Sequence, residues 1–154
     1  MIAPNTSLEA YFEETKIPLR LGLVNESGWP MVLSLWYLYE GGFLYCATPQ
    51  SAKVVAYLIS DPRCAYEVAS DQPPYCGVRG RALATIDNGR GLEILERLLL
   101  RYLGAIDNSL AQKLLTRPDP EVAIRLELQS SYTWNFTDRM IDSLRQKRAK
   151  ICPD

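Results

Sequence analysis

Apolar residues alternate with polar or small ones along much of this chain, which is the period of a β-strand. Leu19, Leu21 and Leu23, for example, alternate with Arg20 and Gly22. The segments with this alternation, or with many β-branched and aromatic residues, are 19–24, 30–39, 43–47, 63–70, 75–86 and 122–128. Since six strands can nearly close a small barrel, we expect a mainly β (α+β) fold with a curved antiparallel sheet and peripheral helices.

Glycine positions add two expectations about this sheet. Glu40-Gly41-Gly42 predicts a tight turn, so the strands before and after it should form a hairpin. Gly77 and Gly80 interrupt the segment 75–86, and glycine inside a strand marks a bend or a close approach of another backbone. We therefore expect the sheet to curve at this segment.

A helical period, with apolar residues three and four positions apart, marks the segments between the strands. Thr6 and Glu9 have the spacing of a capping box, which predicts a helix ending near Lys16. Thr48-Pro49 has the form of an N-cap followed by proline, which predicts a second helix ended by Asp61-Pro62. The other helical segments are 91–101 with Gly104 as its C-cap, a weaker piece at 109–115, and a basic tail at 137–150 that is typical of a solvated face.

Length and composition indicate one domain and a partner subunit. The chain has 154 residues, 47% of them hydrophobic, which suits a single domain at 1–154 with a barrel core at about 19–134. Its formal net charge is -1, so no global field would attract nucleic acid or an anionic membrane. Only 23% of the residues are charged while Tyr occurs 9 times and Trp 3 times, which predicts apolar surface that a homodimer would cover.

Targeting signals and cysteine spacing bear on the compartment. No segment approaches the roughly 20 apolar residues of a membrane helix, and residues 1–5 lack the features of a signal peptide, so we expect a cytoplasmic protein. The cysteines are too far apart for a zinc site or a redox dithiol, which leaves no predicted metal site and reduced thiols at Cys46, Cys64, Cys76 and Cys152.

The chain contains no histidine. This excludes Ser-His-Asp and Cys-His nucleophiles and any zinc or haem iron held by histidine. If the protein catalyses a reaction near neutral pH without the commonest acid-base side chain, a bound cofactor is the expected carrier of the chemistry.

An ordered set of short motifs resembles the pyridoxamine 5'-phosphate oxidase-like family, with coverage from about residue 19 to 86. The motifs are Gly28-Trp29-Pro30, Leu33-Ser34-Leu35-Trp36-Tyr37, Leu44-Tyr45-Cys46-Ala47-Thr48, Ser51-Ala52-Lys53, Asp61-Pro62-Arg63 and, on the final strand, Tyr132-Thr133-Trp134-Asn135-Phe136. The resemblance implies a six-stranded antiparallel split β-barrel that binds FMN in a cleft between two protomers. The expected activity is that of a flavin-dependent oxidoreductase on a small-molecule substrate of unknown identity.

The resemblance also implies which residues bind the cofactor. Those with an expected cofactor contact are Leu33, Ser34, Leu35, Trp36, Ala47, Thr48, Ser51, Lys53 and Tyr75. Two hydroxyls and an ammonium at the start of a helix suit a phosphate, which places the FMN phosphate near Thr48, Ser51 and Lys53. The segment 33–36 would follow the flavin ring and ribityl chain, and Tyr75 would come from the facing subunit.

Departures from the family pattern leave alternatives open. True pyridoxamine phosphate oxidases have arginine and lysine where this chain has Met31 and Trp36, and often a second basic residue in place of Ala52, so vitamin B6 oxidase activity is not expected. The sequence names no acid-base residue. The alternatives are the deazaflavin F420, haem with a Tyr, Cys or Met ligand, or a non-catalytic flavin-binding or dimeric interaction module.

Overall fold

The computed structural model describes residues 7–140 of the chain. In chain order its elements are α1 (Leu8–Glu14), β1 (Leu19–Val24), β2 (Pro30–Leu35), β3 (Leu38–Glu40), β4 (Phe43–Pro49), α2 (Lys53–Ser60), β5 (Arg63–Ala69), β6 (Cys76–Asp87), α3 (Gly91–Leu103), α4 (Ser109–Leu115) and β7 (Glu121–Asn135). Residues 137–140 are helical, and the rest of the predicted basic tail lies outside the described residues.

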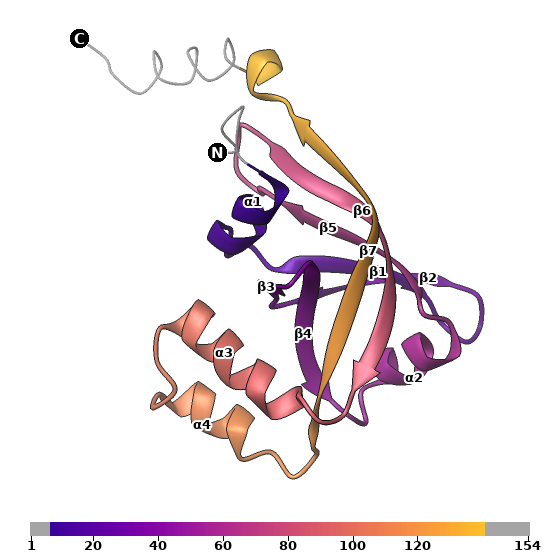
Figure 1. Ribbon diagram of the computed structural model, residues 1–154, viewed down its shortest axis with the longest axis vertical. Helices are drawn as coiled ribbons and strands as arrows, with labels where there is room; N and C mark the ends of the chain where they lie inside the picture. The colour runs from indigo at the N-terminus through magenta and orange to yellow at the C-terminus, as the bar shows by residue number, and fades with distance from the viewer. Residues whose placement is uncertain (1–6, 141–154) are drawn as a thin grey trace, which may run out of the picture.

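All strands of the described chain form one antiparallel sheet, in the order β2-β1-β5-β6-β7-β4-β3. The two edge strands, β2 and β3, are separated in the chain by only Trp36 and Tyr37, so the sheet curls until its edges approach each other (Figure 1). No ladder within residues 7–140 joins β2 to β3, and the sheet therefore stays open at this split. The mainly β, antiparallel class is confirmed, whereas the count is seven strands in an open sheet rather than six in a barrel.

The difference in strand count comes from the segment 30–39, which we predicted as one strand in a hairpin with 43–47. The first part, β2, pairs with β1 instead, and only β3 forms the expected hairpin with β4. Between them the Tyr37 side chain is fully buried, and its hydroxyl lies 3.2 Å and 3.0 Å from the carbonyl oxygens of Phe12 and Thr15. Burying this aromatic ring under α1 turns the chain out of β2 and into the opposite edge of the sheet.

The interior of the curled sheet is the main core. Its largest fully buried side chains include Phe12, Leu21, Tyr66 and Leu126. The Tyr66 hydroxyl is satisfied by Ser131 Oγ at 2.6 Å, as expected for a buried phenol. Gly80 of β6 is paired with Tyr66 of β5. A Cβ at Gly80 would lie 1.9 Å from the Ser130 carbonyl oxygen, so the predicted close approach of another backbone at this glycine is confirmed.

The boundaries of the first two helices differ from the predictions. The N-cap of α1 is Ser7, whose Oγ accepts a hydrogen bond from the Ala10 N–H, so the capping-box assignment to Thr6, outside the described residues, was wrong. Thr48 and Pro49 continue β4 and pair with Val122 and Glu121. The N-cap of α2 is therefore Ala52, and the helix starts at Lys53.

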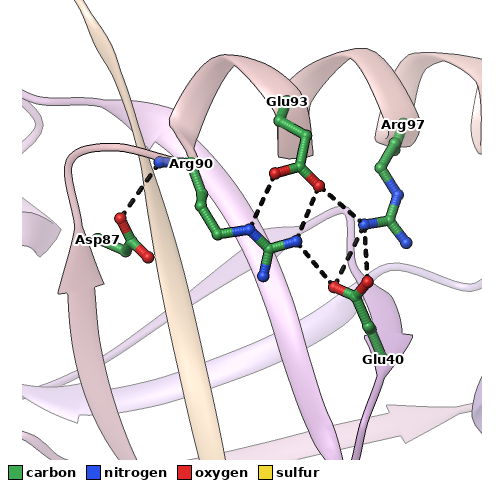
Figure 2. A network of polar contacts seen from close by, with 5 residues as sticks. All are labelled: Glu40, Asp87, Arg90, Glu93 and Arg97. Atoms are coloured by element: carbon green, nitrogen blue, oxygen red, sulfur yellow. Dashed lines mark hydrogen bonds and ion pairs between the residues drawn. The ribbon is translucent and has the colours of Figure 1, made fainter.

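Helix α3 is held against β3 and β4 by a charged network at its start (Figure 2). The Arg90 guanidinium donates to Glu93 (2.8 Å) and Glu40 (2.9 Å), and Arg97 bridges the same two carboxylates. Arg90 lowers the pKa of Glu93 to about 2 and also lowers that of Glu40. Single exposed ion pairs contribute little, but a network that shares its side chains can hold a helix in position. This matters because α3 forms one wall of the candidate site.

The other end of α3 is fixed by Arg101. Its guanidinium donates to the carbonyl oxygens of Glu13 (2.7 Å), Phe12 (2.9 Å) and Thr15 (2.6 Å). These carbonyls belong to the C-terminal end of α1, where backbone acceptors lack helical partners. Arg101 thereby joins α1 and α3, with α4 packed beside α3 on the same side of the sheet (Figure 1).

Cys46, Cys64 and Cys76 are buried free thiols, and Cys152 lies outside the described residues. Burial raises the pKa of the Cys64 thiol to about 11.

Along the described part of the chain, no helix combines the length and apolar character needed to cross a membrane.

Candidate functional site

The split in the sheet holds a pocket of about 210 Å³, which we call the split pocket. It is lined by Ser34, Leu35, Trp36, Ala47, Pro49, Leu95, Leu98, Leu114, Arg117 and Glu121. The residues come from the end of β2, the end of β4, the start of β7 and the two helices α3 and α4. Four of the predicted cofactor residues line this pocket: Ser34, Leu35 and Trp36, which are consecutive in the chain, and Ala47, which comes from β4 near the other edge of the sheet.

The walls of the split pocket are mainly apolar and aromatic. Trp36 stacks on Tyr102 of α3, with ring centroids 5.0 Å apart and an interplanar angle of 9°. This contact fixes the indole plane, and Trp36 also lines the pocket. A flat aromatic wall beside aliphatic side chains suits a planar aromatic ligand.

Glu121 adds a carboxyl group that sequence reasoning missed. Its side chain is only 6% exposed and its Oε1 accepts no hydrogen bond within the described structure. Arg117 Nη1 lies 3.5 Å from this oxygen, yet burial is the dominant effect and raises the pKa of Glu121. The sequence offered no signal for it, because Glu121 lies between Pro120 and the start of the predicted strand at Val122, and its burial depends on tertiary packing.

The charge state of Glu121 makes a testable contribution to stability. Because its pKa is raised in the folded state, the folded protein binds more protons than the unfolded chain, and stability falls as the pH rises through that folded pKa. Glu121→Gln removes this pH dependence. Between pH 4 and pH 7 we expect the stability of the variant to rise relative to that of the wild type. The measurement is the urea midpoint of the variant minus that of the wild type, taken at both pH values. If the difference between the two midpoints is the same at both pH values, burial does not raise the pKa of Glu121.

The predicted phosphate-binding residues are arranged differently from the expectation. Thr48 is buried within β4, so its hydroxyl does not cap α2. Lys53 is exposed at the first position of α2 and forms no ion pair within residues 7–140. Ser51, in the turn before α2, uses both its N–H and its hydroxyl to bind the Asp119 carboxylate. The Asp119 carboxylate therefore occupies Ser51, one of the three groups that we assigned to a cofactor phosphate.

The remaining predicted residues do not line the split pocket. Leu33 is half-buried against the main core. Tyr75 is 39% exposed and precedes β6, whereas α3 follows the other end of that strand. Arg63, the last residue of the Asp61-Pro62-Arg63 motif, is paired with Asp61 at 2.7 Å and lowers the pKa of that carboxyl to about 2. None of these three residues lines the split pocket, and the charge of Arg63 is already paired with that of Asp61.

A second, larger cavity of about 500 Å³ lies on the outer face of the sheet. Its lining residues are Arg20, Gly22, Val32, Ala65, Tyr66, Glu67, Arg79, Gly80, Arg81 and Tyr132. Strand register places Val32 opposite Gly22 and Ser34 opposite Arg20 on neighbouring strands. Ser34 and Val32 are two residues apart on β2 and face the same way, so the split pocket opens at the edge of this outer face.

Comparison with solved structures shows that this fold is that of the pyridoxamine 5'-phosphate oxidase-like proteins, which confirms the resemblance at the level of fold. A protein named F420 reductase matches with a TM-score of 0.68 and 18% identity over 82% of this chain and 98% of its own. A putative pyridoxamine 5'-phosphate oxidase of Listeria innocua matches with a TM-score of 0.60 and 16% identity, over 80% of this chain and 92% of its own. The haem storage protein HutZ of Vibrio cholerae matches with a TM-score of 0.61 and 15% identity, over 79% of this chain and 88% of its own. No family model and no curated protein matches the sequence.

Proposed function

We propose that the chain is one split-barrel domain spanning 1–154 that binds FMN, acts as a cytoplasmic flavin-dependent oxidoreductase and works as a homodimer. The observation that supports the proposal is the split pocket, because four residues with an expected cofactor contact line it. A flavin bound there would supply hydride-transfer chemistry. The chain's own contribution is to orient the ring against Trp36 and to exclude water with the apolar side chains of α3 and α4.

The residues present fit the ring portion of FMN better than its phosphate. The ring portion is planar and largely apolar, and the split pocket offers an indole wall with Ser34, Glu121 and Arg117 as polar groups, of which Arg117 is paired with Glu121. Pockets for complete cofactors have volumes of about 300 to 1,000 Å³. The split pocket, at about 210 Å³, is smaller than this, so further surface must complete the site.

A second copy of the chain is the proposed source of that surface. Large apolar side chains are exposed on the outer sheet face, with Val32 at 70% and Tyr132 at 61%. Arg79 and Arg81 lie beside Glu67 on the same face, which provides the opposite charges that a self-complementary interface needs. Tyr75 would then reach the cofactor from the facing protomer, as the resemblance implies.

Two other cofactors are kept as alternatives because a solved neighbour supports each. The F420 reductase has the highest TM-score of the three structures named above, and HutZ is a haem storage protein. F420 has a longer anionic tail, and the only described arginines near the cavity on the outer face are Arg20, Arg79 and Arg81. A non-catalytic flavin-binding or dimeric interaction module is the alternative from another class.

An absorption spectrum of the purified protein separates these functions. FMN gives a yellow protein with bands in the blue and near ultraviolet, and reduction with dithionite bleaches the blue band. Haem would give an intense Soret band, while F420 would give a single violet band without the second flavin band and a blue-green fluorescence. A colourless protein that also fails to take up added FMN would contradict the proposed function and favour the interaction module.

A further inference from the structure

The connection between α4 and β7 is bound to the turn that precedes α2. The Asp119 carboxylate accepts hydrogen bonds from the Ser51 N–H, at 3.3 Å, and from the Ser51 hydroxyl. The Gln50 N–H also donates to the Pro120 carbonyl oxygen at 2.8 Å. Three hydrogen bonds from two consecutive residues therefore hold this connection over the start of α2.

The backbone around Asp119 favours this position. Pro118 and Pro120 flank it, so the connection has two fixed φ angles and Asp119 itself is restricted to extended conformations. The Asp119 carboxylate is thus presented to Ser51 by a segment with restricted backbone conformations.

The charges near Ser51 do not compensate for a second anion. Arg117 is paired with Glu121 and Arg63 with Asp61. Lys53 is the remaining cation at the start of α2, since it forms no ion pair within the described chain. A phosphate that replaced Asp119 at the Ser51 donors would carry close to two negative charges beside a displaced carboxylate.

We propose that Asp119 is a specificity-determining residue: its carboxylate occupies the donors at Ser51 and lowers the affinity of the site for the phosphate of a flavin. Because the Ser51 donors are occupied, the site would bind FMN mainly through its ring, with Lys53 as the contact to the phosphate, and would discriminate less between FMN and riboflavin than a site whose donors are free. This inference rests on the proposed flavin function. The occupation of Ser51 by Asp119 explains why the residues present fit the phosphate of FMN less well than its ring.

The test is a fluorescence titration of the full chain with FMN and, separately, with riboflavin, which has the same ring and ribityl chain but no phosphate. Asp119→Asn keeps the size of the side chain, removes its charge and adds an amide donor. We expect it to tighten FMN binding by at least tenfold and to change riboflavin binding by less than twofold. Asp107→Asn, an exposed acid on the α3–α4 connection, is the control for net charge and should change neither affinity.

The remaining outcomes contradict the inference in different ways. If Asp119→Asn tightens both flavins equally, the residue controls access to the ring pocket and not phosphate selection. If both flavins bind and neither affinity changes, Asp119 has no role in selection. If no variant binds either flavin, the proposed function itself is wrong, and the inference is overturned with it.

Discussion

Gly91→Ala is expected to destabilise the protein by about 3 kcal/mol, at the upper end of the cost of overpacking. Gly91 begins α3 and packs on the start of β7, where a Cβ would lie 1.9 Å from the Glu121 carbonyl oxygen and 2.5 Å from the Val122 nitrogen. Both atoms are backbone, so no side chain can rotate away. The substitution must push α3 from β7, which would also open the wall of the split pocket.

The matched control is Gly89→Ala, two residues earlier. A Cβ at Gly89 would meet only Asp87 Oδ1, at 3.4 Å, and its φ is not in the left-handed region. We expect this change to alter stability by less than about 0.5 kcal/mol. Urea unfolding of both variants measures the difference, and equal midpoints for the two would show that Gly91 is not needed for the close approach.

Lys53→Ala is expected to weaken FMN binding more than tenfold, because a charge-assisted contact contributes about 1.5–3 kcal/mol. Lys53 is exposed at the start of α2 and is the cation there without an ion pair in the described chain. With the Asp119 carboxylate nearby, its loss would leave the phosphate without a compensating charge. Riboflavin has no phosphate, so its affinity should be unchanged.

Fluorescence titration with both flavins measures the effect of Lys53→Ala, and Lys16→Ala is the control for loss of an exposed lysine. Lys16 follows the end of α1 and lines none of the pockets described above. Unchanged FMN affinity in Lys53→Ala would place the phosphate elsewhere in the site.

Local sequence signals were sufficient for most of the elements. The αL glycine that ends α3, Gly104, and the bounds of α4 followed from periodicity and capping rules alone. The prediction of one strand over 30–39 was wrong because apolar and aromatic residues continue through the break, and only the burial of Tyr37 against α1 shows where the chain leaves β2. Strand pairing depends on contacts between distant segments that a local pattern does not contain.

The candidate site shows the same limit. Ser34, Trp36 and Ala47 were predicted from their resemblance to a family pattern, and the structure brings them together. Glu121 and Asp119 were not predicted, because each reaches the site from the connection and strand that follow α4. An acid after a proline has no special meaning in sequence until the fold shows which donors it meets.

FMN is proposed to bind at a site completed by two copies of the chain, and sedimentation velocity recorded at both the protein and the flavin absorbance tests this most directly. A dilution series with and without FMN reports both assembly and binding in one measurement. We expect the flavin signal to sediment with a dimer at one FMN per chain, and FMN to preserve the dimer at lower protein concentrations, because a ligand that binds only the assembled state favours assembly by mass action. A stable monomer that carries one FMN with full affinity, or a flavin signal that remains free, would contradict the account.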